Sequence, residues 1–435
     1  MSVNIRKKVA MSGSKPTTRP PTTHNCLRIV LITAQAMGNF AIDNLRAEEP
    51  GKLKFKFKSW KVLHTALFSF AYLFCASFSL YKSLTVGILL NQLISPLFYF
   101  HSFITSLLFL QLAYRWPHFM AQWSKIEIHL LKNYKATTDL SKKINYSAVT
   151  MILVALLEHT LAVCNFVYSS NCQNSSTGAE HLFKKEFHFI FNYMPYHFIF
   201  GLLLTFISWT ATFLWNFADV FIVLISMIMT ERFRQINQKI KINVEEVNSS
   251  SNDSSASFIK VYNTDFPKAE YKLWRQIRED YNNLNNIMSH LDQILSNLVL
   301  LSYSFNLTFI LVQLFNSLRQ MDSVIEGIYF FYSFGFVIAR IVTVSIFGAL
   351  INEESQAAMP YLTSLPTEFY NEEIQRLITQ IHVDSAALTG HNFFRITKGL
   401  VLSVAAAIIT YELVLIQFNQ ATLNKYMTAN ETICF

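Results

Sequence analysis

Charged residues are scarce in this chain. Asp, Glu, Lys and Arg make up 15% of its 435 residues, and 52% of the residues are hydrophobic, whereas an ordinary soluble domain has about 25% charged residues. The formal net charge is +8, but the basic residues are scattered among long apolar runs and form no compact patch, which argues against a nucleic-acid-binding protein. The composition therefore predicts a membrane protein.

Cysteines are few, and the common catalytic motifs are missing. The five cysteines show no Cys-x-x-Cys pair and no metal-ligand spacing, so neither a zinc site nor a disulfide scaffold is indicated. No His-Glu-x-x-His motif, Gly-x-Ser-x-Gly motif or phosphate-binding loop occurs. The first 25 residues are basic and polar, so no cleavable signal is expected. An enzyme is the weakest class of function, and no metal or cofactor is predicted.

Long apolar runs are what the chain does contain. A helix needs about 20 mostly apolar residues to cross the hydrocarbon layer. Seven stretches qualify: 62–82, 92–114, 148–170, 195–229, 294–318, 327–351 and 397–420. The sequence therefore predicts an all-α membrane protein with seven transmembrane helices.

The distribution of Lys and Arg predicts the orientation, because cytoplasmic loops retain the positive charge. Residues 1–61, 115–147, 231–290 and 352–398 hold 30 of the 36 basic residues. The amino terminus is therefore predicted to be cytoplasmic and the tail, 421–435, extracellular. A G-protein-coupled receptor has the opposite orientation and is disfavoured. A secondary transporter is a second alternative, but it predicts an internal repeat and broken helices, and neither is seen.

Several segments are predicted to fold outside the membrane. The apolar run 26–42 is too short to span and is expected to lie at the interface or to re-enter. The Ser/Asn run 247–255 predicts a flexible loop, and the periodicity after residue 268 predicts that the fifth span begins as a long cytoplasmic helix. The spacing over 366–396 predicts an amphipathic helix. These extensions suggest a compact cytoplasmic bundle.

Four charged residues lie inside predicted spans, where each costs about 2.5–3.5 kcal/mol. Asp219 is placed where the fourth span leaves the bilayer. Glu158, beside His159, is either half of a buried structural pair or a polar contact in a ligand cavity. Arg340 is interpreted as a counter-ion for an acidic group in the bundle, or as a cavity residue. The fourth is Glu412.

The stretch TYELVLIQF, residues 410–418, carries polar groups within an otherwise apolar span. At 100° per residue, Thr410 and Gln417 share one stripe of the helix, and Tyr411 and Phe418 lie on the neighbouring stripe. Such a face suits a narrow water-filled lumen that closes by dewetting. It equally suits hydrogen bonding between packed helices.

This stretch resembles the Thr-Tyr…Gln-Phe signature in the last span of insect gustatory receptors, and in particular their sugar-receptor group. The resemblance extends through ALTGHNFFRITK, residues 387–398, and LITAQA, residues 31–36. The run GNFAI at 38–42 departs from the group, in which a Met-Pro-Val-like run is expected.

The resemblance implies a ligand-gated cation channel that shares its fold with insect odorant receptors. It implies a tetramer, homomeric or with related receptors, whose central pore is lined by the last span, 397–420, and passes Na⁺, K⁺ and Ca²⁺. Carried over, it makes Gln417 and Phe418 the outer constriction, and Thr410, Tyr411 and Val414 the supporting wall. Glu412 either attracts cations to the pore or pairs with Arg340. A cytoplasmic anchor is implied over 352–396.

A sugar site requires aromatic walls with a few converging polar groups. In the predicted bundle, 62–351, the outward halves of spans two to six supply such groups, and Glu158 and His159 lie deeper along the same cavity. The other candidate ligand contacts are Tyr99, His101, Asn165, Tyr193, His197, Gln313, Tyr329 and Tyr332. A channel for a tastant other than sugar is the alternative. The sequence leaves open whether Cys172 and Cys434 form a disulfide.

Overall fold

The fold is helical throughout the part of the chain that this computed structural model describes, which is residues 22–86, 90–135, 139–173, 178–252, 266–317 and 323–431. No strand occurs in these ranges, where the only extended pairings are two isolated bridges, Asp43 with Lys54 and Thr389 with Arg395. The all-α prediction is confirmed.

Six helices of the described ranges are long and apolar enough to cross a membrane. They are α2 (Trp60–Val86), α3 (Ile94–Asn133), α4 (Leu140–Gln173), α7 (Phe198–Asn252), α9 (Phe266–Ser317) and α10 (Val324–Gln356). Each overlaps one of the first six predicted spans. The seventh predicted stretch forms α13 (Lys398–Glu431).

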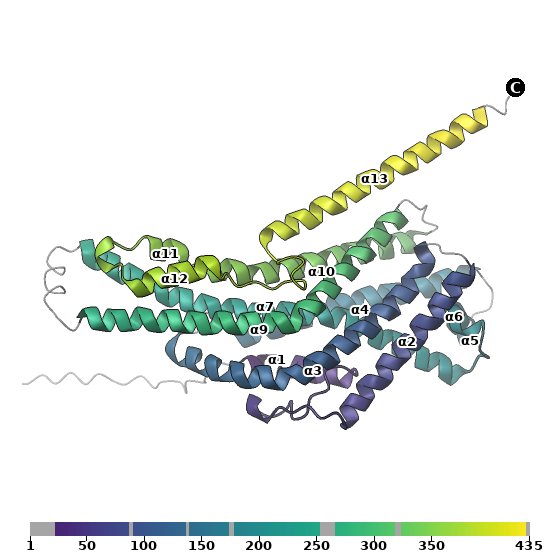
Figure 1. Ribbon diagram of the computed structural model, residues 1–435. Coiled ribbons are helices and arrows are strands. Elements are labelled where there is room, and N and C mark those ends of the chain that lie inside the picture. The colour runs from purple at the N-terminus through teal and green to yellow at the C-terminus, as the bar shows by residue number, and fades with distance from the viewer. Residues whose placement is uncertain are drawn as a thin grey trace, which may run out of the picture.

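Helices α7 and α9 are much longer than a bilayer requires. They contain 55 and 52 residues, which at 1.5 Å per residue makes each about 80 Å long. Both continue beyond the other spans on one side of the molecule, where they meet α11 (Met359–Thr363) and α12 (Glu372–Val383) (Figure 1). The helical start of the fifth span was predicted. The prediction of a flexible loop over 247–255 is wrong for residues 247–252, because α7 continues to Asn252.

The extension is held together by apolar packing and by one buried carboxylate. Trp274 and Tyr281 of α9 are buried in it, as is Leu377 of α12. Glu373 of α12 accepts hydrogen bonds from Arg278 Nε (2.5 Å) and from the Tyr271 hydroxyl (2.9 Å). The Arg278 guanidinium lowers the pKa of Glu373, since the pair favours the charged carboxylate.

The single amphipathic helix predicted over 366–396 is wrong. Helix α12 starts at an Asn371 cap and ends at Val383, and the chain then folds back as an irregular segment. Asp292 of α9 fixes this segment by accepting hydrogen bonds from the Thr389 backbone nitrogen (2.6 Å) and Oγ1 (2.8 Å). His391 turns the chain with a positive φ of 49°. The apolar residues after Val383 therefore pack from a loop, although their spacing resembles that of a helix.

The apolar run 26–42 consists of two pieces. Helix α1 (Thr23–Ala36) ends before Gly38, whose φ of +81° turns the chain. The remainder inserts Phe40 among aromatic rings of the bundle, including Trp116 at 5.7 Å and Phe221 at 6.0 Å. The run is therefore part of the protein core.

Two short helices, α5 (Ala179–Glu186) and α6 (His188–Phe191), connect α4 to α7. The sequence did not predict them. Phe187, Phe189 and Ile190 bury the connection against the bundle. Among the cysteines, Cys26, Cys75 and Cys164 are free thiols, and the side chains of Cys172 and Cys434 lie outside the described part.

Helix α13 stands apart from the rest of the molecule (Figure 1). It touches α9 and α10 and then diverges from the bundle, so that its apolar side chains are exposed in the isolated chain, among them Leu402, Ile409, Tyr411 and Leu413. The apolar side chains of α13 that face away from α9 and α10 require lipid or other chains to cover them.

Candidate functional site

A buried ion pair lies at the centre of the bundle. Arg340 of α10 donates from Nε (2.9 Å) and Nη2 (2.6 Å) to Asp219 Oδ2 of α7, and both side chains are almost fully buried. Ser302 and Asn306 of α9 also donate to this carboxylate, at 2.5 and 3.1 Å. The pair therefore ties three helices together.

The sequence placed Asp219 where the fourth span leaves the bilayer, and α7 continues for a further 33 residues beyond it, to Asn252. One expectation about Arg340 is corrected and another is confirmed. The alternative in which Arg340 neutralises Glu412 is wrong, since the partner of Arg340 is Asp219 and Glu412 is exposed on α13. The interpretation of Arg340 as a counter-ion is confirmed.

An aromatic wall lies beside the pair. The Arg340 guanidinium stacks on the Trp215 ring, 4.3 Å from its centroid. The Trp215 ring in turn contacts Phe309 at 4.6 Å and His101 at 6.3 Å, and His101 lies 4.3 Å from Phe305. Helices α3, α7, α9 and α10 thus place aromatic faces around one charged group.

Several polar atoms of this cluster are buried with no hydrogen-bond partner among the described residues. They are Arg340 Nη1, Trp215 Nε1, His101 Nδ1, Asn306 Oδ1 and Gln313 Oε1. Buried polar atoms nearly always have a hydrogen-bond partner. A group of buried polar atoms without partners therefore marks a place where water or a ligand can bind. By helix rise, Asn306 lies about 17 Å from the end of α9 and Arg340 about 24 Å from the start of α10, which is deeper than the outward half that the sequence predicted.

A second polar network joins α4, α9 and α10. Ser333 Oγ donates to Glu158 Oε1 at 2.9 Å, and Gln313 Nε2 donates to Ser333 Oγ at 3.1 Å. Tyr329 interacts with Ser333, and the Tyr332 hydroxyl donates to the Val154 carbonyl of α4 at 3.2 Å. Four candidates from the sequence, namely Glu158, Gln313, Tyr329 and Tyr332, are therefore brought together.

The remaining ligand candidates are dispersed. Tyr99 is buried against Phe189. Tyr193 is 46% exposed and contacts Tyr81 of α2, and His197 is exposed just before α7. Asn165 is half-buried on α4.

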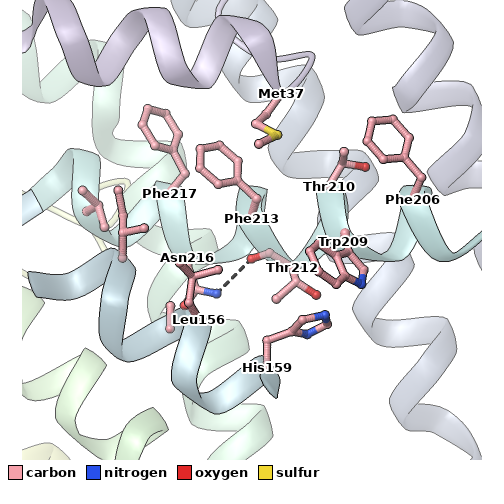
Figure 2. Close-up of a pocket in the computed structure, with 13 residues that line it drawn as sticks. Met37, Leu156, His159, Phe206, Trp209, Thr210, Thr212, Phe213, Asn216 and Phe217 are labelled. Atoms are coloured by element: carbon pink, nitrogen blue, oxygen red, sulfur yellow. Dashed lines mark hydrogen bonds between the residues drawn. The ribbon is translucent and has the colours of Figure 1, made fainter. Parts of the chain in front are cut away.

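His159 lines a different cavity from its neighbour Glu158. This cavity, of about 200 Å³, lies between α4 and α7 and is bordered by Met37 (Figure 2). Its wall is mostly apolar, and the polar side chains from α7 bond to carbonyls of their own helix, as in the hydrogen bond from Asn216 Nδ2 to the Thr212 carbonyl. His159 Nε2 is the one buried polar atom of the described lining that has no hydrogen-bond partner. The His159 ring packs edge-on against Trp209 at 5.1 Å. With so few available polar atoms, the cavity suits a hydrocarbon better than a sugar.

The pore candidates lie on the free part of α13. Thr410 is exposed and donates to the Ala406 carbonyl of its own helix, Tyr411 and Val414 are exposed, and so are Glu412 and Gln417. The side chain of Phe418 is outside the described part. Nothing in the isolated chain covers the described members of this set.

Trp215, Asn306 and Ser333 were not among the candidates from the sequence. Ser302, Asn306 and Gln313 recur at intervals of four and seven residues, which places them on one face of α9, and that polar stripe could have been found. Trp215 has no such signal. Within the described ranges, no three His, Cys, Asp or Glu side chains gather as a metal site.

Comparison with known proteins agrees with the resemblance seen in the last span. A family model described as trehalose receptor matches residues 9–253 and 259–426. The chain is 29% identical over 423 residues to the gustatory receptor for sugar taste 64f of Drosophila melanogaster, covering 96% of this chain and 85% of that protein. It is 26% identical over 401 residues to gustatory receptor 5a for trehalose of the same species, covering 91% and 85%.

The fold is similar to that of a solved structure of another insect chemoreceptor. The insect olfactory receptor OR5 from Machilis hrabei, in complex with eugenol, aligns with a TM-score of 0.65 over 90% of this chain and 97% of that chain, at 10% identity. This similarity shows the fold alone. Since the family model covers most of the sequence, the chain belongs to the trehalose receptor family of gustatory receptors.

Proposed function

We propose that this protein is a sugar-gated, non-selective cation channel of the plasma membrane. The observation that carries the proposal is the cluster of orphan polar atoms beside the Trp215 ring. A sugar presents a flat C–H face, which an aromatic ring accepts, and a rim of hydroxyls, each of which both donates and accepts hydrogen bonds. Arg340 Nη1 and Trp215 Nε1 supply donors, and Asn306 Oδ1 supplies an acceptor.

The pore in this proposal is formed by four copies of α13 around one axis, in a homotetramer or with related receptors. Gln417 and Phe418 form the outer constriction, with Thr410, Tyr411 and Val414 below it, and Na⁺, K⁺ and Ca²⁺ pass when it opens. What supports this arrangement is the exposed apolar surface of α13, which an assembly of subunits and lipid would cover. The homology to sugar-taste receptors supports the same assignment.

In this proposal, the sugar site is coupled to the pore through the residues at the start of α13. Tyr303, next to Ser302 of the Asp219 cluster, shares a hydrogen bond with Ser345 of α10 (2.6 Å). Its ring also lies 4.9 Å from that of Phe394, four residues before α13 begins. A sugar that shifts α9 against α10 would therefore move the start of α13 and draw Phe418 from the axis.

Expression of the chain alone in cultured cells tests the proposed function. Whole-cell current is recorded against a panel of mono- and disaccharides, with G-protein signalling blocked. A sugar-evoked cation current is expected. Sugar uptake without current would instead indicate a transporter, and a current evoked only by other tastants would remove the sugar assignment.

Trp215→Phe is expected to raise the half-maximal sugar concentration about tenfold, which corresponds to one net hydrogen bond of about 1–1.5 kcal/mol. The substitution keeps an aromatic face and removes an indole N–H that has no hydrogen-bond partner among the described residues, so thermal stability should fall only by the packing lost with the smaller ring. Trp209→Phe is the matched control, because Trp209 lines the apolar cavity. Equal sugar sensitivity in both variants would contradict the role given to Trp215.

Glycosylation tests the proposed orientation. With the amino terminus inside, the sequon at Asn174, which lies outside the described residues, faces the glycosylation machinery, and the one at Asn248 does not. We expect a glycosidase-sensitive gel shift that disappears when Asn174→Gln is combined with Asn430→Gln, the other sequon predicted on that face, and that persists in Asn248→Gln. The reverse pattern would invert the topology.

A further inference from the structure

A cavity with basic and aromatic side chains in its wall lies between α3 and α9, away from the sugar cluster. Its volume is about 570 Å³. Three of its lining side chains are cationic or can become so, namely Arg115 and His118 of α3 and His290 of α9, and no acidic residue lines its described wall. The His118 and His290 rings lie 6.4 Å apart, so the two helices present these groups to one space. The wall is completed by Phe55, Tyr114, Pro117, Gln293 and Ile294.

A basic and aromatic segment lies against this cavity. The sequence KLKFKFK, residues 52–58, alternates lysine with apolar residues, and in an extended chain such alternation places the two kinds on opposite sides. Phe55 packs on the Tyr114 ring at 5.6 Å and on Phe57 at 5.0 Å, which fixes the segment beside Arg115. Lysines 54, 56 and 58 are exposed, and no ion pair to a described residue is found for them.

The cavity lies at a membrane boundary. Tyr114 ends the second predicted span and Ile294 begins the fifth. Phe57 in this segment and Trp60 two residues after its end are both more than 70% exposed. Aromatic side chains of this kind occupy the headgroup layer of membranes. In the proposed orientation this boundary faces the cytoplasm, where the anionic lipids are concentrated.

We propose that this cavity binds the headgroup of a phosphorylated inositol lipid from the cytoplasmic leaflet. The Arg115 guanidinium can hold a phosphate through two parallel hydrogen bonds, and the imidazoles of His118 and His290 supply further N–H donors. The volume is within the range of small-molecule sites and exceeds what one phosphate fills. Lysines 54, 56 and 58 add the attraction that basic segments next to a span exert on anionic lipid.

Binding to the purified full-length receptor in phosphatidylcholine nanodiscs tests the proposal. The probe is a fluorescent short-chain phosphatidylinositol bisphosphate. Arg115→Gln should weaken binding about fivefold, the factor expected for one cationic contact at a membrane surface. The triple variant Arg115→Gln, His118→Gln, His290→Gln should weaken it at least about tenfold. The exposed variant Lys54→Gln, Lys56→Gln, Lys58→Gln should also weaken it, without disturbing the helices.

The control is Lys142→Gln with Lys143→Gln, at the exposed start of α4, which should bind the probe as the parent does. Thermal unfolding of each variant establishes that it is folded. Equal affinity in all variants, or equal competition by short-chain phosphatidylcholine, overturns the site. Tighter binding of soluble inositol trisphosphate than of the lipid overturns the lipid source. Because the readout is binding without sugar or current, a negative result here is distinct from a failure of the channel proposal.

Discussion

Arg340→Met is expected to lower the free energy of unfolding by about 3–5 kcal/mol, the cost of leaving one member of a buried ion pair without its partner. Asp219 would keep only the hydroxyl of Ser302 and the amide of Asn306 as donors. Thermal unfolding of the detergent-purified receptor, followed by the loss of its monodisperse elution peak, measures the effect. Sugar-evoked current should also disappear, because Arg340 contributes to the proposed site.

A double-mutant cycle separates the pair from its surroundings. Asp219→Leu should be as destabilising as Arg340→Met, whereas the two together should cost clearly less than the sum, since no charge remains buried. Arg275→Met is the matched control: its partner Glu279 is one turn away on the same helix and both are exposed, so its loss should cost less than about 1 kcal/mol. Additive losses in the cycle would show that Asp219 and Arg340 do not depend on each other.

Phe418→Ala is expected to give a large current in the absence of sugar. In the proposed pore, four Phe418 rings close the outer mouth by excluding water, and a methyl group cannot do so. Whole-cell current at a fixed voltage, normalised to surface protein, should rise several-fold, and added sugar should increase it little further.

The control for this variant is Leu402→Ala, an apolar residue about four turns from the proposed constriction on the same helix. Leu402 is exposed near the root of α13, and its truncation should leave the closed state intact. A Phe418→Ala channel that remains closed without sugar would remove this ring from the gate, and Gln417→Ala would then be examined as the remaining member of the constriction.

The sequence correctly predicted the features that depend on one helix alone. Apolar length alone located the long helices, because about 20 apolar residues have few alternatives to a span. The long helical start of α9 was visible because its apolar residues keep helical spacing from residue 268 onward. The grouping of the unpaired polar atoms into one cluster was not visible, although Arg340, His101 and Gln313 were each among the candidates. Its members come from four helices, and Asp219 meets Arg340 across 121 residues of chain, a distance at which spacing carries no information.

Local residue spacing predicted the wrong secondary structure where tertiary contacts hold the chain in another conformation. Ala386 and Leu388 fit a helical stripe, but Asp292 of α9 captures Thr389 and holds the segment in an irregular path. Asp219 was placed where the fourth span leaves the bilayer, and α7 continues for about 50 Å beyond it. Its burial against Arg340 depends on contacts between helices, which residue spacing within one helix does not predict.

The isolation of α13 has a genetic consequence. In the proposed tetramer, α13 starts in its own subunit and packs against the neighbouring subunits, so a defect in one copy affects every channel that contains that copy. In a heterozygote with equal expression, random mixing into fours would leave only roughly one channel in sixteen free of the altered subunit. Alleles that damage this helix should therefore act dominantly, whereas alleles that prevent folding of the bundle should be recessive.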